Sequence, residues 1–304
     1  VSQTRVIKLE KNTPFLFTAE LAQDLIKKEI TLFEGEYLAK YTNTKNSVKL
    51  IELKNIKTIL NGYETSNPLD QTAKELEITI FVSISEELVL KKIEDTIAQH
   101  FHFNNVKFSS FTLASFAVVR DVYINQDNFL LINIGGEVTD IFMVKKNILR
   151  ESISFPLGYN FIIRKVASLL HSSLDEAESF VSLLKDGHAT ELITKKIDPV
   201  VNKLKAEWLA KFQESLSNLS NDVSVPATIY LTTEKEVADF FSETIKTEQF
   251  NQYTLTESKF KIIFLGAEIF HGLVAFNRDM ISNSSLIIDS IYINRFLTNF
   301  ALSK

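Results

Sequence analysis

The strongest candidate for chemistry is a glycine pair in the segment Asn-Ile-Gly-Gly-Glu-Val-Thr-Asp, residues 133–140. The chain has only eight glycines, and Gly135 and Gly136 are adjacent. Backbone without side chains lets N–H groups approach phosphate oxygens closely. Thr139 adds a hydroxyl donor, and Asp140 could position a metal ion or a water molecule. Taken alone, the pattern favours a plain tight β-hairpin, with the glutamate merely solvated, over a phosphate-binding turn.

Other residue patterns for catalysis or metal binding are absent or weaker. The sequence has no cysteine, which excludes disulfides, thiolate nucleophiles and cysteine-ligated zinc. It has no nucleophile elbow, no Walker-type loop and no Glu-x-x-His pair. His100 and His102 would lie on one face of a strand as a metal pair. No third ligand is close in sequence, so polar residues at a helix exit are the preferred interpretation.

The elements around the glycine pair indicate a layered α/β domain. Strands are expected at 129–134, 138–144 and 149–155, and their short connections favour an antiparallel meander. Further elements are expected in this order: helices 161–170, 174–185 and 199–219, strand 228–231, helix 234–245, strand 261–265, helix 267–276 and strand 286–293. Three antiparallel strands followed by alternating strands and helices are typical of a ribonuclease-H-like domain. Ligands of such folds collect at strand ends.

The first part of the chain has the pattern of a small α+β unit. A strand is expected at 6–9, a helix at 20–28 and an alternating segment at 48–60. That segment ends at Asn61-Gly62, the strongest short turn signal in the sequence. A strand at 76–82 and an amphipathic helix at 86–98 follow.

Composition and charge restrict the class of protein. The 304 residues suffice for about two domains, and 45% hydrophobic residues exclude a disordered protein. Basic residues number 33 and acidic residues 38, a net charge of -5, so nucleic acid is not an expected partner. The longest nearly apolar run, 262–276, is too short to span a bilayer. We expect a soluble chain, or the soluble part of a longer product that begins upstream of Val1.

In this context residues 133–140 resemble the second phosphate-binding region of actin-like ATPases. The resemblance is to the branch of FtsA, the bacterial cell-division actin homologue, and PilM, the pilus-assembly protein. The family pattern is Asp-x-Gly-Gly-x-Thr-Thr-Asp, a Pro-x-Gly-Gly turn, a helix and an Ala-Glu pair. This sequence matches it at Gly135, Gly136, Thr139, Asp140, Pro156, Gly158 and Ala177-Glu178. The preceding α+β unit is similar to the inserted subdomain of this branch.

The resemblance implies an actin-like fold with a helical insertion and a small α+β subdomain. Residues 1–15 would be a remnant strand of a first actin-like subdomain, and 16–108 would form the inserted subdomain, which makes interactions. Residues 109–126 would be a connecting helix. Residues 127–304 would be the second actin-like domain, with the helical insertion at about 172–222.

Three positions of the family pattern carry different residues here. The family's first Asp, which helps to order Mg²⁺ and water, is Asn133, which lacks the charge that favours a dication. The second Gly of the Pro-x-Gly-Gly turn is Tyr159. The basic residue near the nucleotide base is replaced by Val181.

Two glycine-rich loops of the family are also missing. The adenosine turn falls at residues 231–234, where Thr232 and Thr233 would obstruct the approach of a nucleoside. The first phosphate loop, an Asp-x-Gly, has no counterpart in residues 1–130. Either this loop lies upstream of residue 1 or the protein has lost it.

With these departures, the resemblance implies a degenerate nucleotide site. It assigns phosphate contacts to Gly135, Gly136, Glu137, Thr139, Asp140 and Gly158. The nucleoside region would be Glu178, Thr232 and Thr233, and Asn133 and Asp140 would have an indirect role in metal binding. The ligands would be ATP and Mg²⁺, and their binding would be weak or lost in this chain. Loss of one preorganised electrostatic group costs about 10²–10³ in rate, so we expect a weak ATPase at most.

The function implied by the resemblance is that of a cytoplasmic scaffold or adaptor. It would link a protein partner to an assembly at the inner face of the membrane, in cell division or in pilus or secretion assembly, and self-association stays open. The alternative is a working ATPase whose first phosphate loop lies upstream of residue 1. A structural protein without any ligand is the third interpretation.

Overall fold

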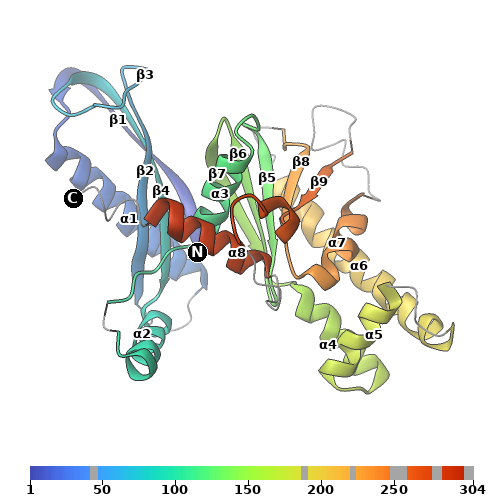
Figure 1. Cartoon of the computed structure of the whole chain (residues 1–304). Helices are drawn as coiled ribbons and strands as arrows, with labels where there is room; N and C mark the ends of the chain where they lie inside the picture. Colours follow the sequence, from blue (N-terminus) through green and yellow to red (C-terminus); the bar gives the residue numbers. More distant parts are fainter. Residues whose placement is uncertain are drawn as a thin grey trace. The chain divides into compact units, whose positions relative to one another are not determined.

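The computed structural model describes residues 1–41, 47–103, 105–185, 191–219, 224–246, 259–275 and 283–297. The chain divides into two compact units, Val1–Leu113 and Ala114–Lys304. Figure 1 labels their helices and strands. Each unit has a β-sheet of its own.

The first unit is built on a four-stranded antiparallel sheet in the order β1-β4-β2-β3. Its strands are β1 (Ser2–Leu16), β2 (Val48–Leu60), β3 (Tyr63–Glu64) and β4 (Thr72–Glu86). Apolar residues alternate along β4 and place Ile78, Ile80 and Val82 in one buried cluster. Helix α1 (Ala19–Tyr41) contributes Phe33 to the same cluster, so it covers this face of the sheet.

Residues 1–15, expected to belong to another subdomain, are part of this same sheet. β1 pairs with β4 from Ser2↔Ser83 to Leu16↔Thr72. The sequence-based boundary at residue 16 therefore falls at the end of a strand of the first unit. The strand is also longer than the expected 6–9, because polar and charged residues on both sides of Val6–Leu9 conceal its pattern.

Two helices follow the last strand of the first unit along the chain. Helix α2 (Glu87–Phe101) follows β4 directly, and His102 ends it with φ 59° while its N–H bonds to the carbonyl of Ala98 at 3.1 Å. His100 and His102 thus lie at the end of a helix and not on one face of a strand. Helix α3 (Phe111–Val122) then runs across the boundary between the two units.

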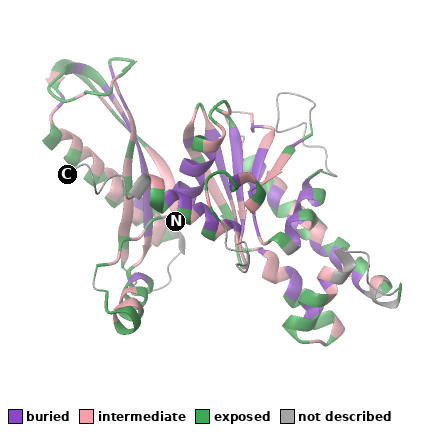
Figure 2. Cartoon of the chain, in the orientation of Figure 1, coloured by how far each residue is buried: buried purple, intermediate pink, exposed green. Residues whose placement is uncertain are grey.

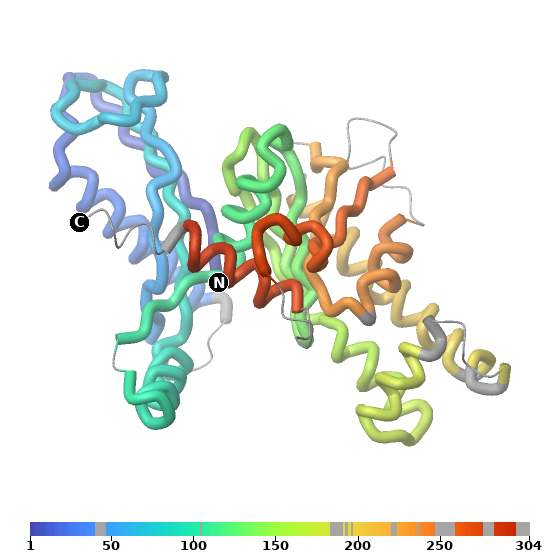
Figure 3. The backbone as a smooth tube through the Cα atoms, viewed as in Figure 1, coloured from blue at the N-terminus to red at the C-terminus, as the bar shows by residue number. Residues whose placement is uncertain are grey.

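The second unit has a five-stranded sheet in the order β7-β6-β5-β8-β9. The strands are β5 (Phe129–Ile134), β6 (Thr139–Lys145), β7 (Ile148–Phe155), β8 (Thr228–Thr232) and β9 (Lys261–Phe264). β5, β6 and β7 are antiparallel, whereas β8 pairs in parallel with β5 and β9 in parallel with β8. The expected meander and the βα unit of β8 and the helix after it are confirmed, and Figure 3 traces the path of the chain.

Helices cover this sheet and create the larger core. They are α4 (Tyr159–Leu170), α5 (Leu174–Lys185), α6 (Glu191–Leu219) and α7 (Lys235–Lys246). Apolar residues of α4 to α7 share one buried cluster with Leu130 and Ile132 of β5, and Trp208 of α6 is 1% exposed within it. Figure 2 shows these buried residues along the central strands and the facing sides of the helices. On the other sheet face, Tyr230 packs against the ring of Tyr123, with the centroids 4.6 Å apart.

The last elements differ from the sequence prediction. The segment expected to be a strand at 286–293 is helix α8 (Ser284–Tyr292), and a π-helical turn, Ile293–Leu297, follows it. The Asn283 side chain caps α8 by accepting a hydrogen bond from the Leu286 N–H at 3.1 Å. The run of Ile residues concealed this signal. The helix expected at 267–276 is only a 3₁₀ turn, Ala267–Phe270.

Helix α6 begins earlier than predicted. It starts at Glu191, so Pro199 lies inside the helix and not in its first turn. None of the helices in the described part of the chain has both the length and the apolar composition that a bilayer span requires.

Two glycines of the first unit should respond oppositely to the same substitution. Gly35 lies in α1 with no atom within 4 Å of a Cβ placed on it, so Gly35→Ala should stabilise the unit by about 0.5–1 kcal/mol. Gly62 has φ +84°, so Gly62→Ala should destabilise it by about 1–2 kcal/mol. Urea unfolding of the full chain, followed by far-ultraviolet circular dichroism, measures both free energies of unfolding. If the two variants changed the free energy in the same direction, the backbone conformations assigned to Gly35 and Gly62 would be wrong.

Candidate functional site

The glycine pair forms the turn that joins the central strand β5 to β6. Ile134 and Thr139 are the last cross-strand pair before the turn, and the Gly135 N–H closes it by donating to the Val138 carbonyl at 2.9 Å. Among the described residues, the N–H groups of Gly136, Glu137 and Val138 have no acceptor. The turn therefore keeps three backbone donors that an anion could use.

The start of α4 packs directly on the backbone of this turn. The N–H groups of Tyr159 and Asn160 donate to the carbonyls of Gly135 and Gly136 at 3.0 and 2.9 Å. These bonds satisfy first-turn donors that a helix leaves without an intrahelical partner. A Cβ on Gly158 would overlap the Gly135 carbonyl oxygen and the Gly136 carbonyl group. Position 158 therefore requires glycine because of close backbone approach.

Thr139, a predicted phosphate donor, points into the core. Its side chain is buried, and its hydroxyl donates to the Leu157 carbonyl at 2.7 Å. The same oxygen accepts a hydrogen bond from the indole N–H of Trp208 at 3.1 Å. Its only hydroxyl proton is thus used inside the domain, where it ties β6 to the loop before α4 and to α6.

The predicted metal residues meet on the opposite face of the sheet. Asn133 and Asp140 are direct cross-strand partners, Asp140 is also paired with Ser154, and Asn133 is paired with Thr232. Cross-strand partners point to the same face, so these four polar side chains form one row at the end of the sheet. The Ser154 hydroxyl donates to an Asp140 carboxylate oxygen at 2.6 Å.

The row does not fit a resident Mg²⁺ ion. Asp140 is its one carboxylate, and it already accepts from Ser154. In the described ranges no three His, Asp or Glu residues come together in a way that could hold a metal ion. Mg²⁺ bound by proteins usually relies on one or two carboxylates together with substrate phosphates, so these residues provide only part of such a site.

Glu137 is held by two side chains of α4 that sequence reasoning missed. Arg164 donates to both carboxylate oxygens, at 2.6 and 2.7 Å, and the Asn160 amide donates at 3.0 Å. Hydrogen bonds from Arg164 and then Asn160 lower the pKa of the Glu137 carboxyl to about 2. The spacing of Asn160 and Arg164, one helical turn apart, was the available signal.

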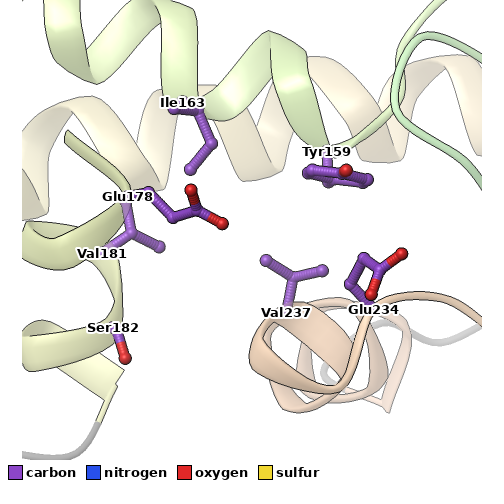
Figure 4. A pocket seen from close by; sticks show the side chains of 7 residues that line it. All are labelled: Tyr159, Ile163, Glu178, Val181, Ser182, Glu234 and Val237. Atoms are coloured by element: carbon purple, nitrogen blue, oxygen red, sulfur yellow. The ribbon is translucent and has the colours of Figure 1, made fainter. Parts of the chain in front are cut away.

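A small pocket lies beside this turn, between α4, α5 and α7. Figure 4 shows its lining, which includes Tyr159, Val181, Glu178 and Glu234. The space open to water-sized molecules is about 30 Å³, whereas small-molecule sites are typically about 300–1,000 Å³. The Tyr159 ring faces Glu234 across the pocket. An adenosine group does not fit this pocket in the observed conformation.

The chemistry of the lining is also unlike that of a nucleotide site. Glu178 and Glu234 are its two charged residues, and both are acidic. Glu234 also accepts a hydrogen bond from the Asn283 amide at 3.1 Å. The negative charge of these carboxylates opposes the approach of a polyphosphate.

The turn after β8 contains the other predicted nucleoside residues. Thr232 and Thr233 are buried, at 3% and 6% exposed. The Thr233 hydroxyl oxygen has no hydrogen-bond partner in the described structure. Of the three residues predicted for the nucleoside region, Glu178 lines the pocket, together with Glu234, whereas Thr232 and Thr233 do not.

Comparison with known proteins identifies the fold. No protein-family model matches the sequence, and no curated protein matches it. Among solved structures, a PilM–PilN type IV pilus biogenesis complex is similar with a TM-score of 0.51 and 15% identity over 80% of this chain. A Bacteroides thetaiotaomicron protein with an actin-like ATPase fold and unknown function is similar over 83% of this chain, with 8% identity and a TM-score of 0.32. Ta0583, an archaeal actin homolog, is similar over 47% of this chain, with 15% identity and a TM-score of 0.32.

The chain has the actin-like ATPase fold. The fold expected from the residues around Gly135 is therefore confirmed. The chain spans 63% of the PilM–PilN complex chain that it matches, 63% of the Bacteroides protein and 50% of Ta0583. At these identities the likeness concerns the fold and not the activity.

The close approach at Gly158 gives a direct test of the site geometry. Gly158→Ala should destabilise the second unit by about 1–3 kcal/mol, because the added methyl group separates α4 from the turn. Gly135→Ala is the matched control: its Cβ would lie 3.5 Å from the Val138 oxygen, an ordinary contact. Trp208 is the only tryptophan, so its fluorescence during urea unfolding reports on this unit. An equal loss of unfolding free energy in Gly158→Ala and Gly135→Ala would contradict the close approach at Gly158.

Proposed function

We propose that the protein is a scaffold or adaptor of the FtsA/PilM type with a degenerate nucleotide site. It would connect a protein partner to a membrane-associated assembly at the cytoplasmic face, in cell division or in pilus or secretion assembly. The proposal makes the chain at most a weak ATPase.

The observation that carries the degenerate site is the small pocket between α4, α5 and α7. Tyr159 stands where the family pattern has glycine, and its ring lies against the pocket. Val181 stands where the family pattern has a basic residue, and it lines the same pocket. Both departures thus reduce the space and the positive charge available to a nucleotide.

The partner role is supported by the fold and by the first unit. The similar PilM structure is described as a PilM–PilN complex, in which PilM is assembled with another protein. We propose that residues 16–108 carry the partner or self-association contacts and that 127–304 form the nucleotide-derived domain, with 109–126 connecting them. Residues 1–15 would complete the sheet of the first unit, with which they pair.

One observation favours the alternative of a working ATPase with a first phosphate loop upstream. Within the described part of the chain, three backbone N–H groups of the turn have no acceptor, and Gly158 allows α4 to pack against the turn. These features suit a phosphate group. They do not supply the nucleoside space, which is why the scaffold is the preferred proposal.

The test is a thermal-shift titration of the chain with ATP and Mg²⁺. A ligand at about 100 times its Kd adds about 2.7 kcal/mol, and each kcal/mol raises the midpoint by about 2–4 °C for a domain of this size. We expect a shift below about 1 °C at millimolar ATP, because Tyr159 and the two carboxylates disfavour the nucleotide. A saturable rise of 5 °C or more would contradict the proposal and favour the ATPase.

A further inference from the structure

We propose that helix α2 is a self-association surface and that its partner is α2 of a second copy of this chain, in an antiparallel pair that crosses at Ile93. The two copies would be related by a two-fold axis, so the same surface would serve on both sides. This inference deepens the proposed function, on which it rests, because it names the surface and the partner for self-association of the first unit.

Helix α2 leaves most of its apolar side chains exposed. Leu90 is the one buried residue of this fully described helix. Val89 and Ile93, one helical turn apart, form an apolar stripe, and Ile93 is 41% exposed. Leu88 and Phe101, nearer the two ends of the helix, are each 66% exposed. Figure 2 shows α2 largely in the colour of exposed residues, and exposed apolar surface of this kind marks an interaction site.

Four charged residues of α2 are separated about Ile93. Lys91 and Lys92 precede it, and Glu94 and Asp95 follow it. Within a single helix, a lysine that precedes a carboxylate is the less favourable order. In the described part of the chain, Lys92 and Asp95 have no ion-pair partner. The order of these charges therefore contributes little to the helix itself and suits contacts with another molecule.

The separated charges favour a second copy as that molecule. When two such helices cross antiparallel at Ile93, the lysines of each copy lie beside the carboxylates of the other. A parallel pair would place like charges together. Lys92 and Asp95 are three positions apart on one flank of the stripe, so the two-fold axis would create two equivalent contacts between them.

The charge balance of α2 makes a membrane a poor occupant of the stripe. The helix has two lysines against three carboxylates, those of Glu87, Glu94 and Asp95. Helices that lie on a bilayer are instead rich in Lys and Arg on their polar face. A bilayer with anionic lipids would therefore gain no electrostatic attraction from α2.

The test is sedimentation velocity of the full chain without nucleotide or a second protein. An interface of this size is weak and transient, so the parent should change from monomer to dimer between about 10 µM and 1 mM. Ile93→Ser should lose measurable dimer, because it removes apolar surface from the centre of both helices. Leu32→Ser is the matched control: Leu32 lies on α1 of the same unit, is 60% exposed, and its variant should equal the parent.

A charge swap tests the antiparallel orientation. Lys92→Glu and Asp95→Lys should each weaken dimerisation about tenfold, because both equivalent contacts change from attraction to repulsion. The double variant should dimerise within about twofold of the parent, since it restores opposite charges across the pair. Glu94 is left unchanged because it pairs with Lys49 of the same chain at 3.7 Å.

The inference is overturned if the parent stays monomeric, if Leu32→Ser loses as much dimer as Ile93→Ser, or if the double variant is no better than the single variants. A monomeric parent that sediments with phosphatidylglycerol vesicles, when Ile93→Ser does not, would also overturn it and assign the stripe to a membrane. Because no nucleotide is present, each of these results leaves in place the degenerate-site scaffold, which the ATP titration tests separately.

Discussion

The contact between Gly158 and the backbone of Gly135 and Gly136 is the constraint on which the candidate site depends. Because no side chain separates them, the first N–H groups of α4 bond to the turn carbonyls. This contact fixes the turn, directs Asn160 and Arg164 toward Glu137, and places Tyr159 in the lining of the pocket. The buried hydrogen bonds from Trp208 to Thr139 and from Thr139 to Leu157 hold the same loop from the core side.

The sequence predicted the architecture of the second unit because its signals were local. The apolar run of β5 and the short turns specified the meander, and the glycines at 135, 136 and 158 indicated where strand and helix meet. The end of the chain could not be predicted in the same way. The run of Ile residues in α8 favours a strand on composition, and the decisive capping bond of Asn283 involves one side chain. The length of β1 was underestimated because the polar and charged residues of this edge strand leave only a weak apolar pattern.

The candidate site was predicted in its position but not in its details. Sequence reasoning placed Asn133 and Asp140 together, and they are cross-strand partners. It also assigned Thr139 to a ligand, whereas the alternation along β6 directs that hydroxyl into the core. Arg164 was missed because its importance comes from a contact over 27 positions, which no short motif records. Under the proposed function, the turn at residues 135–138 would keep the backbone of a phosphate site, and side chains would reduce the adjacent pocket below the size of a nucleoside.

The measurement that tests this account most directly is a calorimetric titration of Mg-ATP into the protein. The result depends on whether the pocket lined by Tyr159 and Val181 admits the nucleoside. The account predicts no saturable heat at up to millimolar ATP and no release of phosphate. Saturable binding in the micromolar range, with phosphate release, would contradict it.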